Sequence, residues 1–256
     1  MSLNYRIMPK WSAYAQYAKG MLTPALAQSS EDNPQLNLSK VQTTTNYQIG
    51  TVYKTSRFNA DLDAYWINYN NFPVQQPNPA DPSNANDLIY FNAQGVYYYG
   101  LEGEATYYAG KGFSLYVDGS RNYATYKKSK RRVENNPQWT AGYGLIYEYD
   151  GFFGSLMAKY IGPYTAYSGA PSPDLPLPAG AFAKIQGGYT MYDLSLGYGY
   201  KLPKGYFLKS IKLRAQINDL FDRKVQLLKS PNVNPLLSTY SVLTPRDYFF
   251  TVSGEF

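Results

Sequence analysis

The chain has 256 residues, 17% of them aromatic, and 24 Lys and Arg against 18 Asp and Glu give a formal net charge of +6. It contains no cysteine and no histidine, which excludes a disulfide framework, thiolate chemistry, and an imidazole acting as general base, metal ligand or haem ligand. No run of about eighteen apolar residues occurs, so a transmembrane helix is excluded as well.

Apolar and polar residues alternate along most of the chain, which is the period-two pattern of β-strands with one apolar and one polar face. We expect the first strand near residues 2–8 and the last near residues 243–256, and we count about eleven strands in all. The clearest alternating segments between these two are 58–66, 101–107, 113–117, 139–147, 152–158, 192–200 and 211–218. The sequence therefore predicts an all-β protein.

Short and long connections alternate between these strands. Short turns are expected at residues 9–10, 56–57, 110–112, 150–151 and 203–205, and long loops near residues 22–43, 70–87, 127–137, 165–188 and 220–242. This rhythm is typical of an antiparallel transmembrane β-barrel, with periplasmic turns, extracellular loops and the apolar face toward lipid. A Tyr-rich soluble β-sandwich shares the strand periodicity, although its Greek-key connections give no reason for the rhythm.

The amino terminus carries no apolar signal-peptide core. Single-chain bacterial barrels use an even number of strands, so an odd count that begins at Met1 leads us to expect a missing amino-terminal part.

The last strand ends on an aromatic residue. Its apolar face carries Tyr248, Phe250, Val252 and Phe256, with Gly254 between the last two. A soluble domain seldom ends on an exposed apolar strand, because an unpaired edge templates aggregation, whereas a closed barrel in lipid accepts it. These five residues resemble the carboxy-terminal assembly signal of bacterial outer-membrane proteins, which implies the barrel-assembly machinery as a partner.

Several motifs resemble those of TonB-dependent outer-membrane receptors. Residues 218–222, Asn-Asp-Leu-Phe-Asp, are similar to the family's Asn-Leu-Phe-Asp motif before the last extracellular loop, with one Asp inserted. Residues 45–68 resemble a mid-barrel hairpin, and residues 92–104 resemble the family's Gly-x-Glu-x-Glu strand. With the terminal Phe256, these landmarks occur in family order and span most of the chain.

The resemblance implies that residues 1–256 form the carboxy-terminal half of a 22-stranded plugged barrel, with the plug domain and amino-terminal strands absent. Such receptors lie in the outer membrane of Gram-negative bacteria and import scarce nutrients, most often ferric siderophores, with energy that the TonB complex delivers through the plug. The implied protein is a transporter without a cofactor and not an enzyme. Its implied partners are outer-membrane lipid, lipopolysaccharide, the TonB complex and a ferric siderophore.

Two alternatives remain open at this stage. One is another outer-membrane barrel, such as a substrate-specific porin, and the other is a β-rich carbohydrate-binding protein. No nucleic-acid partner is expected, because a single basic run occurs without a matching fold.

The candidate ligand-binding residues lie in the expected extracellular loops. A basic run could attract an anionic ferric complex or bind lipopolysaccharide phosphates, or it could be a solvated loop; it comprises Lys127, Lys128, Lys130, Arg131 and Arg132. The aromatic residues Tyr164, Tyr167 and Phe182 could stack on a siderophore or sugar, or pack one loop on another. The proline-rich segment 171–178 is expected to be an extended spacer.

Two carboxylate pairs, Asp61 with Asp63 and Glu102 with Glu104, each share one strand face. Their spacing would suit a glycosidase, but carboxylates that face a barrel lumen and pair with residues such as Lys212 or Arg214 explain them better. We expect no catalytic residue and no metal site.

Overall fold

The computed structural model describes residues 1–23, 40–77, 88–168, 174–177, 179–203 and 207–256. Its main element is an eleven-stranded antiparallel sheet in the order β1-β2-β3-β4-β5-β6-β7-β8-β11-β12-β15. These strands are β1 (Ser2–Met8), β2 (Trp11–Leu22), β3 (Gln42–Lys54), β4 (Phe58–Pro77), β5 (Leu88–Gly110), β6 (Phe113–Tyr126), β7 (Trp139–Tyr149), β8 (Phe152–Ile161), β11 (Tyr189–Lys201), β12 (Ser210–Asn218) and β15 (Asp247–Glu255).

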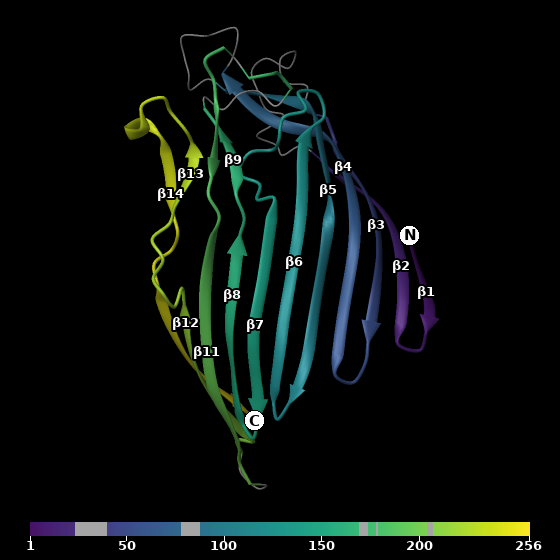
Figure 1. Ribbon diagram of the computed structural model, residues 1–256, viewed down its shortest axis with the longest axis vertical. Helices are drawn as coiled ribbons and strands as arrows, with labels where there is room; N and C mark the ends of the chain where they lie inside the picture. Colours follow the sequence, from purple (N-terminus) through teal and green to yellow (C-terminus); the bar gives the residue numbers. More distant parts are fainter. Residues whose placement is uncertain (24–39, 78–87, 169–173, 178, 204–206) are drawn as a thin grey trace.

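The predicted strand pattern is confirmed. The main sheet has the expected eleven strands, and every alternating segment named above falls inside one of them. The described short turns gather at one end of the sheet and the long connections at the other, as Figure 1 shows. At the Asp150-Gly151 turn both residues have positive φ, 50° and 79°, as a two-residue hairpin turn of the favoured hand requires.

Three of the expected long loops carry more regular structure than predicted. β4 continues to Pro77 and pairs with β5 from Leu88, so the prediction of a loop beginning at residue 70 was wrong. The loop near 165–188 contains β9 (Tyr164–Tyr167) paired with β10 (Ala183–Gln186). The loop near 220–242 contains β13 (Gln226–Ser230) paired with β14 (Thr239–Val242), joined through the short 3-10 helix η2 (Pro235–Leu237). These hairpins are stabilised by backbone pairing between residues that are not neighbours in sequence. The polar composition of the loops does not reveal this pairing.

Parts of other predictions lie outside the described residues. These parts are most of the expected loop at 22–43, residues 78–87 of the loop at 70–87, four residues of the proline-rich segment and two of the turn at 203–205. In the described part of the proline-rich segment, Asp174 and Leu175 form a turn and bend, so the extended spacer is not continuous there.

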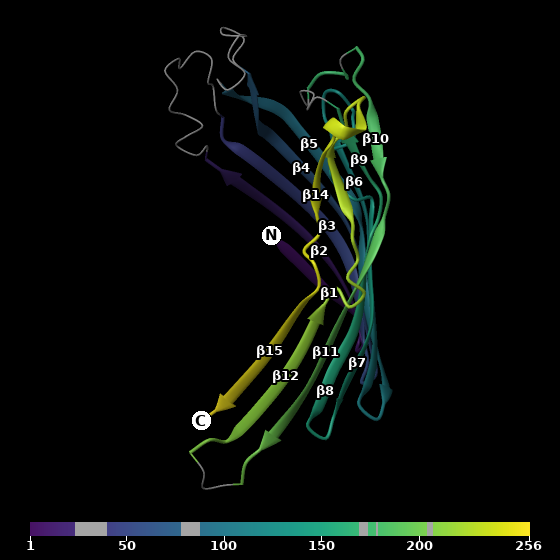
Figure 2. The same cartoon turned by 90° about the vertical axis from the view of Figure 1, so that its left-hand side faces the viewer.

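The sheet is curved, and its first and last strands turn toward the same side in Figure 2. On the polar face, side chains of strands that are two apart in the sheet form hydrogen bonds across the strand between them. This requires the side chains of that face to converge. Tyr14 on β2 reaches Asp63 on β4 across β3 at 3.2 Å, and Tyr65 on β4 reaches Asn122 on β6 across β5. The polar face is therefore the concave one, and the apolar face is convex.

Two further sheets occur among the described residues, β9–β10 and β13–β14, and each has only two strands, so neither covers the face of the eleven-stranded main sheet. A cluster of buried apolar residues consists of Val96, Ala124 and Tyr126, with Tyr98 and Val133 packed against it, and it lies near the long connections. A β-sandwich instead buries its apolar residues between two sheets, so this arrangement argues against the sandwich alternative. Among the described residues, no helix is long and apolar enough to cross a membrane.

Candidate functional site

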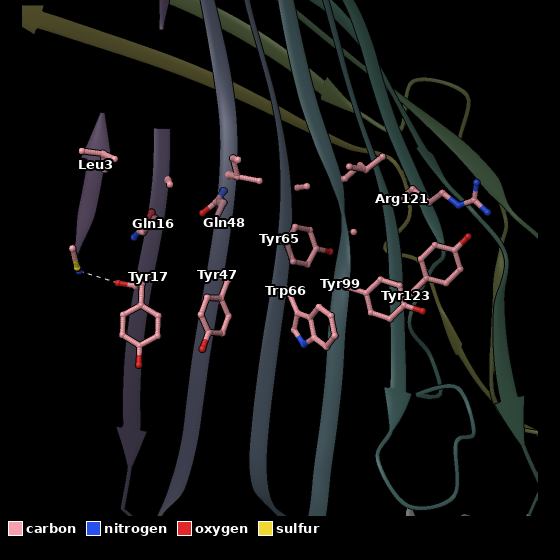
Figure 3. Close-up of a pocket in the computed structure, with 16 residues that line it drawn as sticks. Leu3, Gln16, Tyr17, Tyr47, Gln48, Tyr65, Trp66, Tyr99, Arg121 and Tyr123 are labelled. Atoms are coloured by element: carbon pink, nitrogen blue, oxygen red, sulfur yellow. Dashed lines mark hydrogen bonds between the residues drawn. The ribbon is translucent and has the colours of Figure 1, made fainter. Parts of the chain in front are cut away.

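The convex face carries a row of aromatic side chains near the long connections. Five residues on consecutive strands β2 to β6 are direct partners in register: Tyr17, Tyr47, Trp66, Tyr99 and Tyr123. Their rings lie side by side in Figure 3, with centroid distances of 5.3 Å for Tyr17–Tyr47 and 5.2 Å for the stacked pair Tyr99–Tyr123. Cross-strand aromatic pairs of this kind stabilise a sheet, and aromatic girdles mark both interfaces of membrane barrels.

A second set of aromatic pairs lies near the short turns. These pairs are Tyr53–Phe58, Phe113–Tyr147 and Phe152–Tyr198, with ring centroids 4.6 to 6.2 Å apart. Phe113 and Tyr123 lie at opposite ends of β6, about ten residues and therefore about 33 Å apart along the strand. At a strand tilt of about 40° this corresponds to about 25 Å along the barrel axis, which is the height of a membrane barrel's apolar band.

The face between the two aromatic sets is apolar and exposed. Its large side chains include Ile49, Leu62, Leu101, Leu115, Val117, Leu145, Leu156, Leu196 and Leu213, each more than 40% exposed. A contiguous apolar face of this size marks an interaction with lipid or with a partner protein. Arg121 is the exception, because it lies on this face between Leu101 and Trp139.

The concave face carries carboxylates on three adjacent strands. Asp61 pairs with Glu104, which pairs in turn with Asp118, and Asp63 pairs with Glu102. Among the described residues none of these five forms an ion pair, and no group of three or more is arranged to hold a metal. The expected pairing with Lys212 or Arg214 was wrong, since both lie on β12 away from β4 to β6, and Arg214 Nε donates to Ser195 Oγ at 2.8 Å.

The basic run follows β6 in a loop at the long-connection end. Lys127 is partly buried, donates to Asn70 Oδ1 and lies 4.9 Å from the Tyr97 ring. Burial lowers the pKa of the Lys127 ammonium below its ordinary value. Lys128, Lys130 and Arg132 are exposed, as expected for a solvated loop.

Arg131 is the centre of the loop packing. Its guanidinium lies 5.1 Å from the Tyr167 ring and 5.7 Å from the Tyr126 ring, and its Nε donates to the Leu175 carbonyl at 3.1 Å. Burial raises the pKa of the neighbouring Glu134 carboxyl, and the Arg131 charge opposes that shift. Arg131 thus connects the loop after β6 to residues 167 and 175.

The predicted loop aromatics are placed by packing between loops. Tyr164 is only 5% exposed and its hydroxyl donates to the Leu228 carbonyl at 3.1 Å, while Tyr167 is 7% exposed. Phe182 is half-buried and its backbone pairs with that of Ser168. Of the three predicted aromatic residues, only Tyr167 contacts the basic run, through Arg131. In the described part of the chain, Tyr164 and Phe182 do not contact it. The rings of Tyr164 and Tyr167 are both buried and therefore not open to solvent.

The Asn-Asp-Leu-Phe-Asp segment closes the end of β12. Asp219 is 2% exposed, receives the Arg223 N–H at 2.6 Å, and its own N–H donates to Asp193 Oδ1 at 2.9 Å. The Phe221 ring packs edge-on against Tyr192 at 5.1 Å. Asp219 holds this chain reversal in place, a role that the sequence analysis did not assign to it.

The predicted assembly-signal residues lie on one face of the last strand. β15 pairs with β12 along its whole length, with Gly254 opposite Ile211. The four apolar members, Tyr248, Phe250, Val252 and Phe256, are 62% to 72% exposed. They extend the apolar convex face to this edge of the sheet.

The fold and its faces define the class: a curved antiparallel sheet with two aromatic girdles, an apolar outer face and a polar inner face. The family described as "TonB dependent receptor-like, beta-barrel" matches residues 1–220. The chain belongs to this family, whose members are outer-membrane transporters of Gram-negative bacteria and not enzymes. A comparison with curated protein sequences found no match.

Several solved receptor structures have the same fold. A mutant of the ferric enterobactin receptor PfeA from Pseudomonas aeruginosa has a TM-score of 0.73 at 17% identity, covering 99% of this chain and 39% of that one. The ferric yersiniabactin uptake receptor FyuA from Yersinia pestis gives 0.66 at 18% identity, covering 100% and 37%. The copper transporter OprC gives 0.72 at 14% identity, covering 98% and 38%. This chain therefore spans less than two fifths of each solved receptor.

Proposed function

We propose that residues 1–256 are the carboxy-terminal part of the barrel of an outer-membrane receptor that imports a ferric siderophore with energy from the TonB complex. The observation that carries this proposal is the family match over residues 1–220 of a sheet with two aromatic girdles. In this proposal the plug domain, its contact with TonB and the remaining strands come from chain outside these residues.

The open sheet supports a larger barrel. Its two edge strands, β1 and β15, each have a partner on one side only. Lipid leaves no water to satisfy an unpaired strand edge, so a spanning sheet must close. The coverage of about 38% of solved receptors leaves enough chain for further strands and a plug to close and fill it.

The loop charges favour an anionic iron complex over a copper ion as the ligand. The basic run places five cationic side chains at the long-connection end of the sheet, where they raise the local concentration of anions. Of the imidazole, thiolate and thioether ligands that copper sites use, this part of the receptor offers only the thioethers of its five methionines.

The other proposed partners follow from the two exposed surfaces. The apolar convex face would contact membrane lipid and lipopolysaccharide, and the exposed apolar strand β15 would be recognised by the barrel-assembly machinery. Both proposals depend on the outer-membrane location.

Iron-limited growth tests this function. A strain lacking the gene would be fed a panel of ferric siderophores, and uptake of radioactive iron would be compared with that of the complemented strain and of a strain without TonB. The proposal requires that uptake of one ferric siderophore fails in both mutants and returns on complementation. Uptake that persists without TonB would support the porin alternative instead.

A further inference from the structure

An arginine interrupts the apolar convex face next to the aromatic row. Arg121 on β6 is the direct partner of Leu101 on β5 and of Trp139 on β7. Its guanidinium carbon lies 4.6 Å from the Trp139 ring and 5.0 Å from the Tyr123 ring. A charge on the lipid face of a barrel is strongly destabilising at the midplane but much less so near the interface, so this height is where a lipid-facing arginine is tolerated.

A second arginine reaches the same ring from the loop. The guanidinium carbon of Arg132 lies 6.0 Å from the Tyr123 ring, and its backbone forms a bridge with Thr125. Within the described ranges, neither Arg121 nor Arg132 forms an ion pair, and no acceptor receives a hydrogen bond from either guanidinium. Each group carries five N–H donors in a planar fork that matches phosphate oxygens.

An apolar hollow adjoins this pair of arginines. On the short-turn side of the aromatic row runs a second row of cross-strand partners, in which the small Ala15 and Ala64 alternate with Leu3, Ile49 and Leu101 before Arg121. The hollow that they and the aromatic rings line has a volume of about 910 Å³. Figure 3 shows the aromatic rings along it, with Arg121 at its end beside Tyr123.

We propose that Arg121 and Arg132, with Tyr123 and Trp139, bind the phosphate-bearing headgroup of an outer-leaflet lipid, one of whose acyl chains lies in the hollow over Ala64. The proposal rests on the proposed function, because it needs the convex face to lie in the bilayer. Charge complementarity selects the occupant: two guanidinium groups attract an anionic phosphate and repel the ammonium of a zwitterionic headgroup. Long arginine side chains at this height extend toward the headgroups while their stems stay in the apolar layer.

The test uses the whole receptor purified from outer membranes in a mild detergent. Native mass spectrometry would count bound lipid after incubation with diphosphorylated lipid A or with phosphatidylcholine. The variants are Arg121→Gln, Arg132→Gln and the matched control Lys184→Gln, which removes one exposed charge from β10. Each arginine variant should weaken lipid A binding about tenfold, since a hydrogen bond to a charged group contributes about that factor, and the control should not.

The outcomes distinguish a lipid phosphate from free phosphate as the ligand. They also distinguish binding at the two arginines from binding elsewhere. Equal loss in Lys184→Gln, or no loss in Arg121→Gln, would overturn the site, and so would equal binding of phosphatidylcholine. Inorganic phosphate at millimolar concentration should not displace the lipid; full displacement would show a site for the free anion instead. Spin labels on the convex face test the bilayer location separately, so failure of the site and failure of the proposed function are distinguishable.

Discussion

The hydroxyl of Tyr14 donates a hydrogen bond to Oδ2 of Asp63 at 3.2 Å across the strand that lies between them. The facing residue on that strand is Gly50, and a β-carbon there would lie 2.5 Å from Cζ of Tyr14. The same arrangement recurs two strands along, where Tyr65 crosses Gly100 to reach Asn122. Tyrosines that lie over strand glycines thus connect alternate strands on the concave face.

Replacement of Gly50 by alanine should destabilise the sheet. The added β-carbon would also lie 2.7 Å from Cβ of Asp63, so Tyr14 must move and its hydrogen bond is lost. We expect a loss of about 1–3 kcal/mol, which is typical of overpacking, measured by urea unfolding of the protein in lipid vesicles. The matched control is Gly199→Ala, whose β-carbon meets Lys212 at an ordinary 3.4 Å. Equal losses in the two variants would contradict this role of Gly50.

Replacement of Asp219 by alanine should loosen the end of β12. The N–H of Arg223 would lose its charged acceptor, which costs about 1.5–3 kcal/mol. We expect faster hydrogen exchange at Arg223 and at Leu220, whose N–H bonds the Tyr192 carbonyl. In Asp174→Ala, a loop control, exchange at these two amides should be unchanged. Unchanged exchange in the Asp219 variant would contradict the assignment.

The contact between Asp222 and the segment before β15 should depend on pH. The hydrogen bond from Lys224 at 2.8 Å, with the N–H of Arg246 at 3.2 Å, lowers the pKa of Asp222 below the ordinary 3.8. Because the folded-state pKa is the lower one, the stabilisation is present above about pH 4 and is lost as the pH falls through the folded value. Hydrogen exchange at Arg246 should therefore accelerate below pH 4.

Lys224→Gln removes the main cause of that shift, so the acceleration should begin at a higher pH in this variant. An Arg246 amide whose exchange shows only the intrinsic pH dependence, or the same onset in both proteins, would contradict the contact.

Spin labels on β12 should alternate in their environment. Leu213 lies on the convex face, and its neighbours Lys212 and Arg214 lie on the concave face. In outer-membrane vesicles, a label at Leu213 should be accessible to oxygen, which partitions into lipid, and labels at 212 and 214 to a water-soluble relaxant. Uniform access of the water-soluble reagent to all three sites would show that the convex face is not in lipid.

The strand pattern could be predicted from the sequence because alternate residues of a barrel strand face lipid and the barrel interior, and are apolar and polar accordingly. The alternation of apolar and polar residues was enough to assign Leu196, Tyr198 and Leu213 to the convex face. The same alternation along β6 places Arg121 on one face with Leu115, Val117 and Tyr123. The sequence therefore indicated the lipid-facing position of Arg121, and this was missed.

The loop packing could not be predicted in this way. Burial of Tyr164 depends on the Leu228 carbonyl, and burial of Tyr167 accompanies its contact with Arg131. These partners are tens of residues away in sequence and do not follow from a periodic pattern. The hairpins β9–β10 and β13–β14 form for the same non-local reason, and so the loops expected from composition contain strands.

The size of the native polypeptide in outer-membrane fractions shows directly whether these residues belong to a longer receptor; it would be measured on a denaturing blot with an antibody against residues 240–256. The sequence of 28.9 kDa corresponds to about 38% of a solved receptor, and 28.9 kDa divided by 0.38 gives about 76 kDa. We expect a band near that mass in the outer membrane. A band at 28.9 kDa, or a band in the soluble fraction alone, would contradict this expectation.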